Sequence, residues 1–119
     1  ELRVAYLRHR LHSSREAPSG YDVLKMATRG SARLLGRDDI GQLAPGKCAD
    51  LFLIDSRRLE FVGSCFDAGS VLGTVGVRGP VDYTVVHGKV TVRHGRLVTV
   101  DEDRVAREAN EKCRAYLNM

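Results

Sequence analysis

Apolar residues recur at helical spacing in three parts of the chain, and mostly polar residues fill the positions between them. A period of three to four residues is typical of an amphipathic helix with one buried face. We therefore predict helices over residues 1–12, 20–35 and 101–117. The residues that form the three stripes are Leu2, Ala5, Tyr6, Leu7 and Leu11, then Val23, Leu24, Ala27, Ser31 and Leu34, and finally Val105, Ala109, Cys113 and Tyr116.

The middle helix has recognisable ends. Ser19 and Asp22 stand three residues apart, and this spacing predicts a capping box at the start of the helix. Gly36 follows the last periodic residue, where a glycine in the left-handed conformation commonly ends a helix. Gly30 inside the helix costs roughly 1 kcal/mol relative to alanine, so we expect close packing to use the space that it leaves.

A different pattern begins at residue 51. Leu51–Ile54 is a short apolar run between two aspartates, which suits a strand buried on both faces. Periodicity alone does not distinguish such a run from a buried helix. The brevity of the run and the turn-forming pair Pro45-Gly46 before it favour the strand.

Residues 81–86, 89–93 and 96–100 read as three further strands joined by two tight turns. The turns contain His87-Gly88 and His94-Gly95. Two-residue hairpin turns require positive φ, and histidine is among the non-glycine residues enriched in that conformation. We therefore interpret both histidines as turn residues, with metal ligation as the alternative.

The composition is that of an ordinary globular protein. The chain has 119 residues, 43% of them hydrophobic and 29% charged, with a formal net charge of +4. No apolar run approaches the ~20 residues that span a bilayer, so we predict no membrane partner. Basic residues are spread along the chain, whereas nucleic-acid binding needs a clustered basic face, so we predict no nucleic-acid partner. Three widely spaced cysteines indicate reduced, largely buried thiols and a cytoplasmic location.

Candidate chemistry is sparse. His9 and His12 share a helix face, but no acidic or cysteine ligand lies near them in the sequence, so a solvated face is favoured over a metal site. Cys48 or Cys65 could act as a nucleophile with a histidine base, although nothing local supports this. Lys47 is interpreted as a surface turn residue rather than an anion site. We predict no catalytic, cofactor-binding or metal-binding residue in the chain.

Two stretches carry a resemblance to a known family. Residues 40–51 read I-G-x-L-x-P-G-K-x-A-D-L and are followed by Ile54-Asp55. This pattern resembles the C-terminal hallmark of metal-dependent amidohydrolases, in the branch of atrazine chlorohydrolases, hydroxyatrazine hydrolases and 8-oxoguanine deaminases. The runs Lys25–Thr28 and Ala32–Gly36 resemble the same branch, where the corresponding helix follows the last strand of the barrel.

The resemblance implies an α+β fragment. Residues 1–38 would be the last helices of a TIM-type barrel, residues 39–100 the C-terminal strands of a small β-sandwich, and residues 101–119 a terminal amphipathic helix. The family also implies a short helix near residues 68–74. A whole TIM barrel takes about 250 residues and cannot be contained in this chain.

The implied parent enzyme hydrolyses a C–N or C–Cl bond, most simply by deamination, on a purine- or triazine-like heterocycle. In the family, a metal such as Zn or Fe is held by a His-x-His and further ligands, and this sequence contains no His-x-His. The fragment is therefore expected to lack the metal centre and to be inactive. Its expected partners are the missing N-terminal part of its own enzyme and, through unpaired strand edges in residues 81–100, further copies of itself. The alternative is a stand-alone β-rich interaction or oligomerisation module without catalysis.

Overall fold

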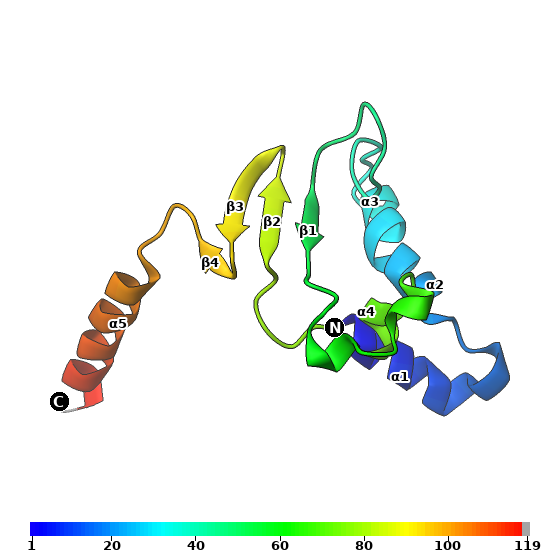
Figure 1. The fold of residues 1–119 in the computed structure, drawn as a ribbon, viewed down its shortest axis with the longest axis horizontal. Coiled ribbons are helices and arrows are strands. Elements are labelled where there is room, and N and C mark those ends of the chain that lie inside the picture. Colours follow the sequence, from blue (N-terminus) through cyan, green and yellow to red (C-terminus); the bar gives the residue numbers. More distant parts are fainter. Residues whose placement is uncertain (118–119) are drawn as a thin grey trace.

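The computed structural model describes residues 1–117 and shows two groups of secondary structure, followed by a terminal helix (Figure 1). Its α-helices are α1 (Leu2–Ser13), α2 (Gly20–Lys25), α3 (Ser31–Leu34), α4 (Val71–Thr74) and α5 (Glu102–Leu117), and its strands are β1 (Leu51–Leu53), β2 (Tyr83–Val86), β3 (Lys89–Arg93) and β4 (Arg96–Leu97). Short 3-10 turns cover Ser14–Glu16, Leu59–Phe61 and Cys65–Asp67. The predicted α+β class is confirmed.

The first group consists of α1, α2 and α4, which pack against one another. Val23 of α2 and Val71 of α4 are buried, and so is Phe61 at the end of the 3-10 turn Leu59–Phe61. The helices α2 and α4 approach closely because glycines face each other. A Cβ built on Gly73 would lie 2.7 Å from the Cα of Gly20.

The predicted helix over residues 20–35 is confirmed with one local change. The turn Met26–Gly30 between α2 and α3 has π-helical hydrogen bonding. Ser19 and Asp22 form the predicted capping box, in which the Asp22 N–H donates to Ser19 Oγ at 3.1 Å. Gly36 has φ of 66°, as a left-handed cap requires. The expectation for Gly30 is wrong, because a Cβ there would meet only the Lys25 carbonyl oxygen, at 3.7 Å.

The second group is a four-stranded antiparallel sheet with the order β1-β2-β3-β4. Both predicted hairpin turns are confirmed, since His87 and His94 have φ of 49° and 50°. The last strand is shorter than predicted and ends at Leu97. The short helix near residues 68–74 is present as α4, over its second half.

Three burial predictions are wrong. Phe52 and Leu53 of β1 are 45% and 54% exposed, because β1 is the edge of the sheet and pairs only with β2 among the described residues. The predicted buried stripe of α5 contains no buried residue, since α5 extends away from the rest of the chain (Figure 1). Cys48, in the loop before β1, is half-buried, whereas Cys65, in a short 3-10 turn, and Cys113, on the open helix α5, are exposed.

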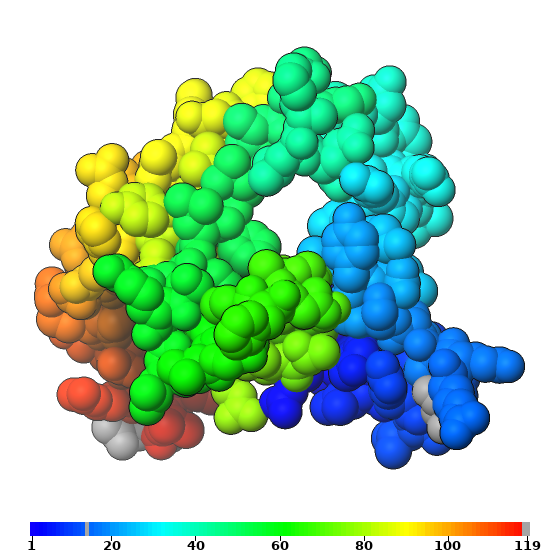
Figure 2. Space-filling model, turned by 45° about the vertical axis from the view of Figure 1, so that its right-hand side comes forward, coloured from blue at the N-terminus to red at the C-terminus, as the bar shows by residue number. Residues whose placement is uncertain are grey.

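The chain is open rather than compact. Its radius of gyration is 18.2 Å, against about 13.5 Å for a compact domain of this length. Its accessible surface of 9420 Å² exceeds the roughly 6,400 Å² of a compact 13.1 kDa protein. The space-filling view shows an opening near the centre of the molecule (Figure 2). Among the described residues, no helix is long and apolar enough to cross a membrane.

Candidate functional site

An apolar groove lies between the helices and the sheet, at the opening seen in Figure 2. It has a volume of about 470 Å³. Gly41 allows the loop before β1 to contact the π-helical turn Met26–Gly30. Its φ is 84°, a conformation that favours glycine, and a Cβ at this position would lie only 2.9 Å from the Thr28 carbonyl oxygen. The apolar residues that line the groove are Tyr21 and Leu24 of α2, Leu43 of the loop, Leu51 and Phe52 of β1, and Leu72 of α4.

A polar cluster joins the loop before β1 to the turn between β2 and β3. Arg37 donates to both carboxylate oxygens of Asp39, at 2.9 and 2.6 Å. The Cys48 thiol donates to Asp39 at 3.2 Å and lies 3.6 Å from Nδ1 of His87. The His87 N–H donates to Asp50 Oδ1 at 2.7 Å. The cluster therefore links the segment after α3 to the loop before β1 and to the turn between β2 and β3.

The electrostatics of this cluster oppose a catalytic thiolate. Hydrogen bonds from Arg37 and Cys48 hold the pKa of Asp39 well below its usual range. The hydrogen bond to that carboxylate raises the pKa of the Cys48 thiol, and partial burial raises it further. Because the thiolate is the nucleophilic form of cysteine, this environment does not suit Cys48 to nucleophilic chemistry.

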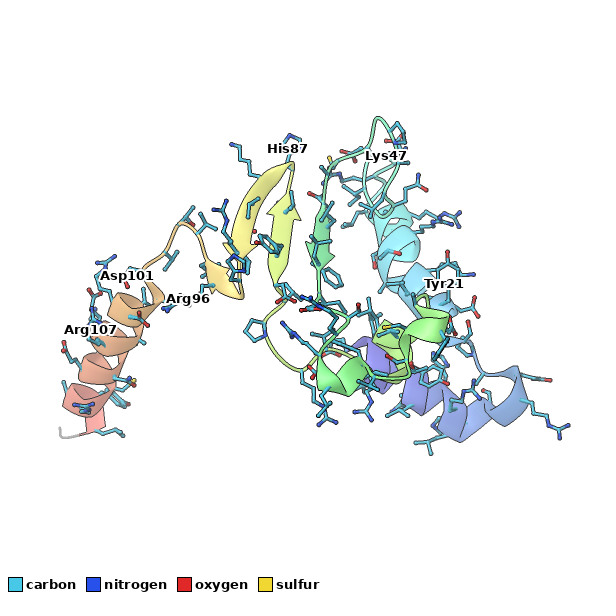
Figure 3. The ribbon with its side chains drawn as sticks, viewed as in Figure 1. Tyr21, Lys47, His87, Arg96, Asp101 and Arg107 are labelled. Atoms are coloured by element: carbon cyan, nitrogen blue, oxygen red, sulfur yellow. The ribbon has the colours of Figure 1, made fainter. Side chains whose placement is uncertain are left out.

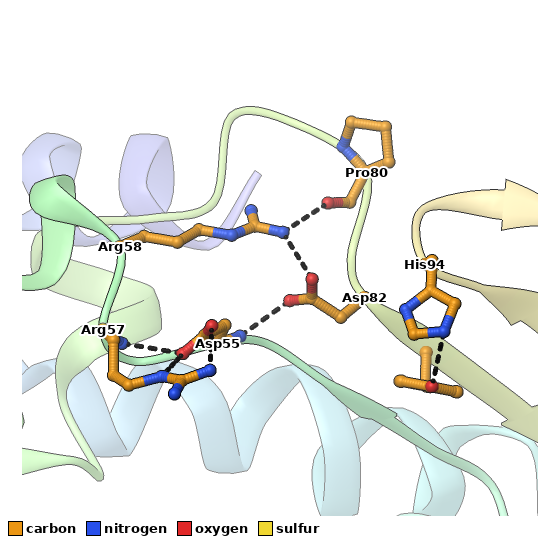
Figure 4. A network of polar contacts seen from close by, with 7 residues as sticks. Asp55, Arg57, Arg58, Pro80, Asp82 and His94 are labelled. Carbon is orange, nitrogen blue, oxygen red and sulfur yellow. Dashed lines mark hydrogen bonds and ion pairs between the residues drawn. The ribbon is translucent and has the colours of Figure 1, made fainter.

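A second polar cluster holds the end of β1 against the start of β2 (Figure 4). The carboxylate of Asp82 accepts the Asp55 N–H at 2.7 Å and Nη2 of Arg58 at 2.9 Å. The same Arg58 nitrogen lies 3.5 Å from the Pro80 carbonyl oxygen. Arg57 donates to the Asp55 carboxylate and lowers the pKa of Asp55 to about 2. The hydrogen bond from Asp55 and the Arg58 guanidinium lower the pKa of Asp82.

The remaining candidate residues are dispersed. His9 and His12 are exposed on α1, and His94 contacts the Tyr83 hydroxyl at 3.1 Å. Lys47 donates to the Asp38 carbonyl oxygen, and it lies with His87 on loops at one end of the molecule (Figure 3). Among the described residues, no group of three or more His, Cys, Asp or Glu side chains could hold a metal ion.

Sequence reasoning missed the two polar clusters. Their partners are far apart along the chain: 24 residues separate Arg58 from Asp82, and 39 separate Cys48 from His87. The motif at residues 40–55 contains Asp50 and Asp55, but it carries no signal that pairs them with the strands that follow.

Comparison with known proteins decides the family. The model of the amidohydrolase family matches residues 1–91. This chain belongs to the amidohydrolase family. The matches include enzymes of the branch predicted from residues 40–55, and that prediction is confirmed. Hydroxydechloroatrazine ethylaminohydrolase of Pseudomonas sp. (strain ADP) is 44% identical over 112 residues, which is 92% of this chain. The 8-oxoguanine deaminase of Pseudomonas aeruginosa is 53% identical over 64 residues, 54% of this chain and 14% of that enzyme.

A solved amidohydrolase structure shares this arrangement. The atrazine chlorohydrolase TrzN from Arthrobacter aurescens TC1, complexed with zinc, superposes with a TM-score of 0.81 and 34% identity over 92% of this chain. The chain spans about a quarter of the enzymes it matches: 23% of the ethylaminohydrolase and 25% of TrzN. The described residues do not fit a zinc centre, because they offer no ligand cluster.

Proposed function

We propose that this chain works as one part of a longer metal-dependent amidohydrolase, which hydrolyses a C–N or C–Cl bond on a triazine- or purine-like heterocycle. The observation that carries the proposal is the 44% identity to hydroxydechloroatrazine ethylaminohydrolase along 92% of the chain. The superposition on zinc-bound TrzN supports it. The names of the ethylaminohydrolase and the 8-oxoguanine deaminase favour release of an amine or ammonia over release of chloride.

Within that enzyme, the chain has a structural role. The helices α1 to α3 belong to the end of the barrel, the sheet belongs to the C-terminal part of the sandwich, and α5 is a terminal helix. The metal centre is supplied by the remainder of the enzyme, because the residues described in this chain do not fit one. The chain alone is therefore inactive. The family match over residues 1–91 argues against a stand-alone interaction module.

The test is a chimera of the Pseudomonas sp. (strain ADP) enzyme in which the segment that aligns with this chain is replaced by these 119 residues. We expect the chimera to retain bound metal and to hydrolyse the substrate of the unmodified relative, while the 119-residue chain alone has no activity. A control chimera with Phe61→Asp should not fold, because Phe61 is only 1% exposed and a carboxylate there would be buried without a partner.

Two results with the chimera would contradict the proposal. A chimera that fails to fold, or that folds without activity, would overturn it. The intact mass of the native gene product is an independent measurement, since the proposal expects a mass several times 13.1 kDa.

A further inference from the structure

A row of basic side chains follows the helical segment from α2 to α3. Lys25, Arg29 and Arg33 are four residues apart along this segment, and Arg37 continues the spacing just beyond the Gly36 cap. Residues four apart are neighbours on a helix face, and like charges at such positions repel each other. The whole chain has a formal net charge of only +4, so this row is a local concentration of positive charge.

Only the two ends of this row have acidic partners. Nζ of Lys25 lies 2.7 Å from the carboxylate of the capping box, and Nη2 of Arg37 lies 2.6 Å from the carboxylate of Asp39. Among the described residues, neither Arg29 nor Arg33 forms an ion pair. Both of these arginines are exposed. An additional anion is therefore attracted most strongly to the middle of the row.

The two unpaired arginines line a cavity of about 250 Å³. Arg37 and Lys47 line it as well, and the one acidic residue in its lining is Asp38. Lys47 reaches the cavity from the loop before β1, beside the upper end of the helical segment in Figure 3, and its ammonium donates to the Asp38 carbonyl oxygen. The helical segment, the residues after it and the loop thus bring four cationic side chains to one cavity.

The geometry of the donors indicates which anion fits. Arg37 uses Nε and Nη2 for the Asp39 carboxylate, which leaves Nη1 for a ligand, and the ammonium of Lys47 has three N–H groups. The planar fork of a guanidinium matches both carboxylate and phosphate. A carboxylate has two oxygens in one plane, whereas a phosphate presents oxygens in several directions, as donors from three segments require. Drug-sized ligands occupy about 300–1,000 Å³, so a cavity of about 250 Å³ suits a smaller anion.

We propose that Arg29, Arg33, Arg37 and Lys47 bind the phosphate group of a small anion. At pH 7 such a group carries a charge between about −1.5 and −2, which offsets the repulsion within the row. Inorganic phosphate and a phosphate monoester present the same chemistry to these side chains. The inference does not depend on the reaction proposed above, because the whole site lies within residues 29–47 and involves no metal ion.

Isothermal titration calorimetry with inorganic phosphate tests the site. The ionic strength is held constant with chloride, so that the general screening of charges is the same throughout the titration. We expect the 119-residue chain and the chimera described above to bind phosphate, because both carry the whole site. A parallel titration with glycerol phosphate distinguishes the two sources of the group. A Kd about tenfold lower than that of inorganic phosphate identifies a monoester as the ligand.

Substitutions in the row assign the binding to these residues. Arg29→Gln and Arg33→Gln should each raise the Kd for phosphate by about tenfold or more, because each removes a charge-assisted hydrogen bond. Asp38→Asn should lower the Kd by about threefold, because it removes the carboxylate that repels the ligand. Arg107→Gln is the matched control, since it removes the same charge from an exposed position of α5, far from Lys47 in Figure 3.

Thermal unfolding without phosphate separates a binding role from a structural one. Arg29→Gln and Arg33→Gln should then leave Tm unchanged or raise it slightly, because they remove repulsion between like charges. With phosphate present, the unsubstituted chain should be stabilised and these two variants should not, because a ligand stabilises only a protein that binds it. In the chimera, only binding that responds to these substitutions counts, since phosphate groups also bind metal ions.

Three results would overturn this inference. The first is no phosphate binding by either protein, and the second is an equal loss of binding in Arg29→Gln and Arg107→Gln, which would indicate attraction to the net charge alone. The third is binding of an oligonucleotide by a chain that does not bind phosphate, which would identify a nucleic-acid surface instead. An inactive chimera counts against the proposed function only, because the phosphate titration of the 119-residue chain does not depend on activity.

Discussion

The packing of α2 against α4 provides the sharpest test of the fold, through the substitution Gly73→Ala. The new Cβ would lie 2.7 Å from the Cα and 3.0 Å from the carbonyl oxygen of Gly20. Non-bonded carbon atoms are most stable about 3.5–4.0 Å apart, so the two helices would have to separate by about 1 Å. Both contacts are to backbone atoms, which cannot turn aside as a flexible side chain can. The separation would also loosen the buried contacts of Val23 and Val71, which flank the two glycines.

Overpacking of this kind costs about 1–3 kcal/mol. For a domain of this size, each kcal/mol corresponds to roughly 4 °C, so Tm should fall by about 4–12 °C. Gly30→Ala is the matched control, because its Cβ would meet only the Lys25 carbonyl oxygen at 3.7 Å. That change should stabilise the helix by up to about 1 kcal/mol. Thermal unfolding followed by circular dichroism at 222 nm measures both variants, at about pH 7. Equal shifts for the two variants, or no loss in Gly73→Ala, would refute the close approach of the helices.

Three further predictions concern the core, the second polar cluster and the first hairpin turn. Phe61→Ala should cost about 3–5 kcal/mol because Phe61 is 1% exposed, whereas Phe66→Ala should have no effect because Phe66 is 99% exposed; chemical denaturation of both variants checks this. The lowered pKa of Asp82 means that its contribution to stability is fully present above the ordinary carboxyl pKa of about 3.9 and is lost as the pH falls through the lower pKa of the folded state. Tm should therefore decline below about pH 4, and Asp82→Asn should flatten that decline; an unchanged slope would contradict the ion pair with Arg58. His87→Val should cost about 1–2 kcal/mol and His87→Asn much less, because a β-branched residue does not tolerate a φ of 49°; equal stability of the two variants would argue against the turn geometry.

The sequence by itself determined the local elements of this chain and its family. The capping box at Ser19, the glycine that ends the helix at Gly36 and the turns at His87 and His94 all lie where the pattern predicts them. Each depends on residues within about four positions of one another, so a short stretch of sequence contains the whole interaction. The motif at residues 40–55 identified the amidohydrolase branch for the same reason, because it is contiguous.

Only the tertiary structure decided which faces are covered and which distant residues meet. The apolar pattern of Leu51–Ile54 and of α5 predicted burial, yet neither stretch contains a buried residue. An apolar face in the sequence indicates that a packing partner is needed, but it does not indicate which segment that partner is. The groove takes its lining from four separate segments, and the contacts of Asp82 with Arg58 and of Gly73 with Gly20 join residues more than 20 positions apart. Such contacts follow from how the helices and strands are placed relative to one another, and that placement depends on the packing of the whole chain rather than on any local pattern.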